Sequence, residues 1–235
     1  MSTIIRAVHE PFHGILMMSA IVGAVREPPL RGNVLFMNVL YFIGQSYSSR
    51  NFNDLEQIVW QYKLAPETVN LKASKAVPEI QIFSIALKDG ELKPEVLRCM
   101  DLAIPFPIIF ELRFDGKVQP TAAFKRPSEA DFTQWVSSEY FAGNWTADAT
   151  PRKPLPLVFD LEALYGHLLH PLLPYPARPG ENLQERVERM ELIRLKQREL
   201  ERCKTRLHRE KQFNRKVAIN AELREIKNVL LKLEK

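Results

Sequence analysis

Two glutamates close to a predicted strand are the residues of this chain that come nearest to a catalytic pattern. Glu67 follows Pro66, and Glu79 opens the run Glu79-Ile80-Gln81, where the strand is predicted to start. Two carboxylates held close together can bind Mg²⁺ and activate a water molecule bound to the metal. Glu67, Glu79 and Gln81 are therefore the candidate catalytic residues of the sequence.

The same pattern is similar to the acidic pair and strand-borne Glu-x-Lys of metal-dependent restriction-type nucleases. Gln81 stands where those enzymes carry lysine. The alternative interpretation is structural, with Glu67 in a turn and Glu79 at a strand edge. A Mg²⁺-dependent nuclease thus remains one alternative function for the chain.

Other catalytic motifs are absent from the sequence. It contains no Gly-rich phosphate loop, no Gly-x-Ser-x-Gly elbow, no His-Glu-x-x-His and no paired cysteines. His167 and His170 lie three apart on a predicted helix but lack a third ligand nearby, and Cys99 fits a packing role better than a nucleophilic one. We predict no cofactor and no metal site, and we favour a protein without enzymatic activity.

The C-terminal quarter is the most informative part of the chain. Residues 181–235 contain neither Gly nor Pro, so they predict helix throughout, and a single helix of that length would measure about 80 Å. Near its end, apolar residues recur every three or four positions and form a seam that a partner, a second copy or another part of the chain must cover. The seam, which is the predicted partner-binding site, consists of Ile219, Leu223, Ile226, Leu230 and Leu233.

The seam loses its register between residues 208 and 218. Two arrangements accommodate such a break: a phase shift within one continuous coiled coil, or a reversal that makes an antiparallel helical hairpin. Because no Gly or Pro marks the break, we favour the continuous helix.

The same tail carries most of the positive charge. Residues 178–235 hold 17 Lys and Arg against 10 Asp and Glu, whereas the rest of the chain is nearly neutral. A basic stripe can bind phosphates or an acidic partner, but it can equally be a solvated helix face that only confers solubility. The nucleic-acid candidates are Arg202, Arg206, Arg209, Lys211, Arg215 and Lys216.

The remaining pattern predicts an α+β fold with a mainly antiparallel sheet and flanking helices. An amphipathic helix is expected from residue 54, with its apolar face at Leu55, Ile58, Val59 and Tyr62. Period-two alternation predicts a strand over residues 80–87, Pro94 suits the start of a helix over 95–102, and Asp115-Gly116 predicts a hairpin between strands 108–114 and 117–124. A further strand is expected over 140–145 and a short helix over 161–169.

These elements divide the chain into four expected parts: a leader (1–33), an α+β domain (34–150), a proline-rich connector (151–180) and a basic coiled-coil tail (181–235). The apolar run at residues 15–25 is shorter than the ~20 residues that span a bilayer, so we expect no membrane segment. The two cysteines show no disulfide spacing, and we expect a cytoplasmic protein.

Several segments resemble the prokaryotic family known as domain of unknown function 4391. They are WQYKLAPETVNL (60–71), VPEIQIFSIAL (77–87), AIPFPIIFEL (103–112), AAFKR (122–126) and, most specifically, REKQFNRKVAINAELREIK (209–227). The resemblance runs from about residue 38 to the C-terminus. It implies no established reaction and brings no catalytic residues. Members tend to be encoded beside helicases and DNA methyltransferases of restriction or phage-defence systems.

The sequence therefore favours a non-catalytic accessory protein, a partner subunit of a helicase- or methyltransferase-containing defence system. Its C-terminal helix would bind that partner or a second copy of the chain. A DNA-binding protein acting through the basic tail is the second alternative, beside the nuclease.

Overall fold

The computed structural model describes residues 54–131, 134–152 and 154–235. The expected leader, residues 1–33, lies outside these ranges. The chain divides into two compact units between Leu172 and Leu173, and the proline-rich stretch contributes to both. Each unit is described separately below.

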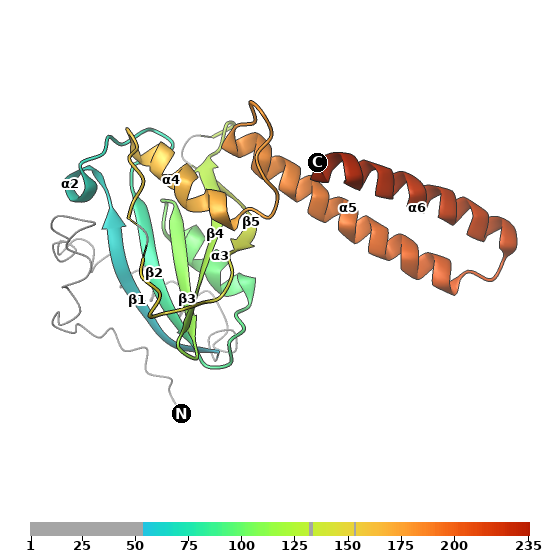
Figure 1. Cartoon of the computed structure of the whole chain (residues 1–235), viewed down its shortest axis with the longest axis horizontal. Coiled ribbons are helices and arrows are strands. Elements are labelled where there is room, and N and C mark those ends of the chain that lie inside the picture. The colour runs from blue at the N-terminus through green and yellow to red at the C-terminus, as the bar shows by residue number, and fades with distance from the viewer. Residues whose placement is uncertain (1–53, 132–133, 153) are drawn as a thin grey trace. The chain divides into compact units, whose positions relative to one another are not determined.

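The first unit is built on one twisted sheet of mixed direction (Figure 1). Its strands are β1 (Leu55–Leu64), β2 (Ile80–Leu87), β3 (Ile108–Phe114), β4 (Lys117–Pro127), β5 (Trp135–Ala142) and the short β6 (Thr146–Ala147). They follow the order β1-β2-β3-β4-β5, with β6 paired to β4. Only β2 and β3 run parallel among these pairs, so the expected α+β fold with a mainly antiparallel sheet is confirmed.

Helices complete the unit. α2 (Pro66–Val69) follows β1, α3 (Pro94–Ala103) connects the parallel strands β2 and β3, and α4 (Leu161–Leu169) with the 3₁₀ turn η3 (His170–Leu172) ends the unit. On β4, Lys125 contacts the end of α3 while its neighbour Phe124 stacks on Tyr165 of α4. Since neighbouring strand residues point to opposite faces, α3 and α4 cover opposite faces of the sheet.

The core lies between the sheet and α3. Its centre is a row of aromatic rings across three strands, in which Phe83 packs between Trp60 and Phe110. Aliphatic residues of α3 and the strands surround it: Leu55, Ile58, Ile85, Leu87, Val96, Leu97, Met100, Ile104, Ile108 and Leu112. Alternation along β3 buries Ile108, Phe110 and Leu112 in this core, whereas Phe114 at the strand end is 38% exposed.

The Asp115-Gly116 turn forms as predicted. Both residues have positive φ, 47° and 67°, which is the backbone conformation of a two-residue primed hairpin turn. The strand over 80–87, the helix over 95–102 and the helix over 161–169 are also confirmed. The strand expected over 140–145 is instead β5, which starts at Trp135 and ends at Ala142.

The amphipathic helix expected from residue 54 is wrong, because this segment is strand β1. Its pairing with β2 is interrupted twice, between Leu55 and Gln57 and between Trp60 and Tyr62. A bulge adds one residue to a strand and reverses which face the following side chains meet. The buried residues therefore lose the period of two and mimic helical spacing.

The second unit is an antiparallel helical hairpin. α5 (Leu183–Arg209) and α6 (Phe213–Glu234) lie side by side, joined by Glu210, Lys211 and Gln212 (Figure 1). The continuous helix expected from the sequence is not formed, and the hairpin alternative holds. Glu210 and Gln212 adopt extended backbone, which reverses the chain without Gly or Pro.

Candidate functional site

The structure brings the candidate nuclease residues together, but through a lysine. Lys63, near the end of β1, lies with its Nζ 2.9 Å from Glu67 Oε1 and 2.9 Å from Glu79 Oε2. Gln81 Nε2 donates to Glu79 Oε1, and Trp60 Nε1 donates to Gln81 Oε1 at 2.7 Å. The ammonium group thus sits between the two carboxylates, where a metal ion would have to bind.

Charge favours this ion-paired state. Burial alone would lower the pKa of Lys63, but its hydrogen bonds to Glu67 and Glu79 raise the pKa above its ordinary value. The hydrogen bond from Lys63 also lowers the pKa of Glu67. The described residues include no group of three His, Cys, Asp or Glu side chains placed to hold a metal ion. The cluster ties β1, α2 and β2 together, and its nuclease role remains a prediction.

Lys63 was not expected to belong to this cluster. The bulge between Trp60 and Tyr62 brings Lys63 opposite Gln81 in the strand pairing, on the same face of the sheet. The one sequence signal was the four-residue spacing between Lys63 and Glu67. That spacing is typical of helices, and here it arises from a strand followed directly by α2.

A second polar cluster, also unexpected, is buried beneath α3. Lys125 is 2% exposed, and its Nζ donates to the carbonyl oxygens of Asp101 and Ile104 and lies 3.5 Å from the Asp101 carboxylate. Tyr140 donates its hydroxyl proton to the same carboxylate. Burial raises the pKa of Asp101 and lowers that of Lys125. The lysine supplies donors to the carbonyl end of α3, a structural role.

A third polar group lies on the sheet face opposite α3. The buried Glu111 carboxylate on β3 receives two hydrogen bonds from Arg152, at 2.5 and 2.8 Å, and one from Arg113 at 3.0 Å. Arg113 also donates to Ser84 and Asp148. These bonds fix the segment after β6 to the sheet, and every polar group in them is paired within the chain.

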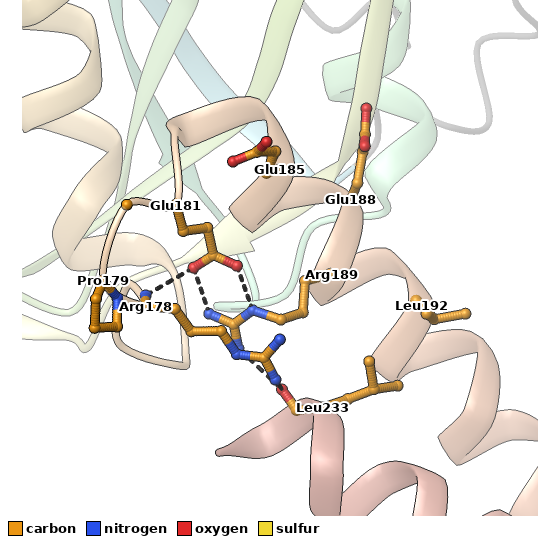
Figure 2. A pocket seen from close by; sticks show the side chains of 9 residues that line it. Arg178, Pro179, Glu181, Glu185, Glu188, Arg189, Leu192 and Leu233 are labelled. Carbon is orange, nitrogen blue, oxygen red and sulfur yellow. Dashed lines mark hydrogen bonds and ion pairs between the residues drawn. The ribbon is translucent and has the colours of Figure 1, made fainter.

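In the second unit, arginines close the base of the hairpin (Figure 2). Glu181 accepts two hydrogen bonds from the Arg189 side chain, at 2.6 and 2.8 Å, and one from the Arg178 backbone N–H at 2.9 Å. Both arginines then donate to the carbonyl oxygen of Leu233, at 3.0 Å. The last carbonyls of a helix lack partners within it, so the guanidinium groups cap α6.

A hollow of about 490 Å³ lies beside this arginine clamp. Its wall also includes Glu185, Glu188 and the partly exposed Leu192 (Figure 2). The guanidinium donors that face it already bind carbonyl oxygens and Glu181. We therefore interpret the hollow as the outer surface of a structural joint.

The predicted partner-binding seam is covered by the same chain. Ile219, Leu223, Ile226 and Leu230 are 8, 9, 4 and 7% exposed, and Leu233 is half-buried. Contacts that cross the hairpin include Cys203 Sγ to the Ile219 carbonyl at 3.6 Å and a two-pronged Arg206–Glu222 ion pair at 3.1 Å. A partner could reach these residues only after the hairpin opened, so their partner-binding role remains a prediction.

The hairpin tip is the region where charge stays unneutralised. Residues 202–216 contain seven Lys and Arg against a single Glu, Glu210. The Glu210 carboxylate accepts the backbone N–H groups of Lys211 and Gln212, at 2.8 and 2.9 Å, and so serves the turn. Of the nucleic-acid candidates, those that are exposed and form no ion pair within the described chain are Arg202, Arg209, Lys211, Arg215 and Lys216.

Three of the arginines converge. Arg206, Arg209 and Arg215 line a hollow of about 430 Å³ together with Glu210, Ala218 and Ile219. The structure thus brings together candidates from both sides of the turn, which the continuous helix would have separated. We define the hairpin tip as residues 202–217 and treat it as the candidate functional site.

The comparisons with known proteins identify the family and nothing finer. Among the described residues, no helix is both long and apolar enough to cross a membrane. No curated protein and no solved structure matches the chain. The family profile described as Domain of unknown function (DUF4391) matches residues 50–230, which include every element of the sheet and nearly all of the hairpin, and the chain therefore belongs to this family.

Proposed function

We propose that this protein is a non-catalytic accessory protein that binds nucleic acid through the tip of its α5–α6 hairpin. The observation that carries the proposal is the set of exposed, unneutralised basic side chains gathered where the two helices meet. A solvated face that only confers solubility would be expected to intersperse acids among its bases. The tip contains one acidic residue, Glu210, and its carboxylate accepts hydrogen bonds from two backbone N–H groups of the turn.

The chemistry of the tip suits phosphate groups. The three arginines at the hollow carry planar guanidinium groups, which bind phosphate oxygens in pairs. The guanidinium group of Arg206 already donates two hydrogen bonds to Glu222, so Arg209 and Arg215 supply the donors for a phosphate. Phosphates of a nucleic-acid backbone are therefore the ligand that matches both the sign and the geometry of the site.

The family supplies a setting for this activity. Members of the family tend to be encoded beside helicases and DNA methyltransferases, which suggests a cytoplasmic accessory subunit of a DNA restriction or phage-defence system. In this proposal the hairpin holds DNA while a protein partner acts on it. The buried seam supports a role in keeping the two helices together, so we place the nucleic-acid contact at the tip and not on the seam.

The test is the binding of a fluorescently labelled duplex DNA to the full chain, measured by anisotropy over a series of salt concentrations. Each phosphate contact should contribute about −0.9 to the slope of log affinity against log salt. The triple variant Arg209→Glu, Arg215→Glu and Lys216→Glu should abolish binding and flatten this slope. None of these residues has an ion-pair partner in the described structure, so the fold should be retained.

A matched control makes the same change of charge away from the tip. Arg198, Arg224 and Lys227 are exposed residues of the same two helices, and their triple replacement by Glu alters the net charge equally. This control should keep most of the affinity. Equal loss in both triple variants, or no binding by the wild type at low salt, would contradict the proposal.

A further inference from the structure

The hairpin tip carries an exposed aromatic ring among its cations. Phe213 is the first residue of α6 and is 77% exposed, and Val217, one helical turn later, is 54% exposed. Residues four apart lie on the same side of a helix, so the two make a small apolar surface. Lys211, Arg215 and Lys216 flank the ring in sequence and are exposed as well.

An occupant of this surface must combine a negative charge with a flat apolar face. Nucleotides have both, since a phosphate and an aromatic base are joined in one residue. Stacking of a base on an aromatic side chain beside a basic groove is a recurrent mode of binding to unpaired strands. In an intact duplex the base faces are stacked on one another, so Phe213 could not reach them.

We infer that the hairpin tip recognises a junction between duplex and single-stranded DNA, with the duplex phosphates on the arginines and the first unpaired base on Phe213. This inference rests on the proposed function and names its substrate class. One ring can stack on one base, which favours a junction over a long single strand. Phe213 is the only Phe, Tyr or Trp within residues 181–235, the sequence that forms α5 and α6.

The test compares a blunt duplex with a duplex of the same length that carries a single-stranded overhang. The wild type should bind the overhang probe about tenfold more tightly. Phe213→Ala should remove this preference but leave the affinity for the blunt duplex and its salt dependence unchanged. Phe213→Trp should keep the preference, because indole stacks at least as well. The exposed Leu195→Ala on α5 is the matched apolar control and should behave as the wild type.

The outcomes separate the two proposals. Salt-dependent binding without preference for the overhang would overturn the junction inference and leave the proposed function standing. Equal weakening of both probes by Phe213→Ala would also overturn it. Absence of binding to both probes would overturn the proposed function and the inference together. The same conclusion would follow if poly-glutamate bound as tightly as the overhang probe and its binding depended on Phe213.

Discussion

At the scale of single residues, Glu181 is a titratable group that holds the base of the hairpin together through Arg189. Its hydrogen bonds with the Arg189 side chain, together with the Arg178 backbone N–H, lower its pKa from 4.5 to about 2. A carboxylate with a lowered pKa in the folded state binds fewer protons there than in the unfolded state. The Glu181 carboxylate therefore stabilises the folded state at pH values above its ordinary pKa, and this stabilisation is lost as the pH falls toward about 2.

We expect Glu181→Gln to lower the free energy of unfolding of the hairpin by ~2 kcal/mol near neutral pH, the usual contribution of hydrogen bonds to a charged group. As the pH falls from the ordinary pKa of Glu181 to about 2, the stability of the variant should also decrease less than that of the wild type. Urea unfolding followed by circular dichroism across this pH range measures both effects. The exposed Glu188→Gln, whose carboxylate accepts only from Gln184 among the hydrogen bonds described, serves as control. Equal pH profiles of wild type and Glu181→Gln would contradict the assignment.

At the scale of elements, the start of α6 is weakly encoded by its own sequence. Gln212 occupies the N-cap position without a side-chain hydrogen bond to the helix, and the first turn contains no acidic residue. Basic residues lie close to this end instead, although the helix dipole favours negative charge there. By contrast, Asn182 and Glu185 form a complete capping box at the start of α5. The position of α6 is therefore set by its packing on α5 and not by a local signal.

Replacing Gln212 by Asp should stabilise the hairpin by ~1 kcal/mol, because Asp accepts the free N–H groups of the first turn and suits the positive end of the helix. Chemical unfolding monitored at the helical signal would detect the change. Gln212→Ala, which cannot cap, should leave stability within a few tenths of a kcal/mol of the wild type. If Asp and Ala behaved alike, the first turn would have to find its partners elsewhere.

Some of the helices and strands could be predicted from the sequence and others could not. Strands β2 and β3 with helices α3 and α4 were predictable because their alternation, proline and capping signals are local. β1 was not, because two bulges removed its alternation. The hairpin turn was not either, because Glu210, Lys211 and Gln212 are ordinary helix-compatible residues. The chain reverses here because the apolar faces of α5 and α6 cover each other. The contacts Cys203–Ile219 and Arg206–Glu222, each between residues sixteen apart in the sequence, illustrate this packing.

The candidate site was predictable in its residues but not in its shape. A run of basic residues is visible in the sequence, yet only the reversal of the chain places Arg206, Arg209 and Arg215 around one hollow. Lys125 on β4 pairs with Asp101 on α3, and Glu111 on β3 pairs with Arg152 in the segment after β6, so the tertiary fold brings these positions together. The spacing of residues along the chain does not predict such contacts.

At the scale of the whole molecule, the two compact units provide separate spectroscopic signals. Trp60, Trp135 and Trp145 all precede Leu173, so tryptophan fluorescence reports on the first unit. The second unit contains α5 and α6, helices of 27 and 22 residues, which dominate the helical circular dichroism signal. A chain of two units need not unfold in a single transition.

Ile226→Ala should therefore lower the transition followed by circular dichroism and leave the fluorescence transition in place. Ile226 is 4% exposed within the hairpin, and truncation of a buried isoleucine typically costs ~2–5 kcal/mol. The reciprocal variant, Leu97→Ala on the buried face of α3, should shift the fluorescence transition and leave the helical signal in place. Parallel shifts of both signals in either variant would show that the units unfold together. The size of the hairpin transition also bears on partner binding, because the free energy of opening α6 from α5 is the cost that any protein must meet before it reaches Ile219, Leu223 or Leu230.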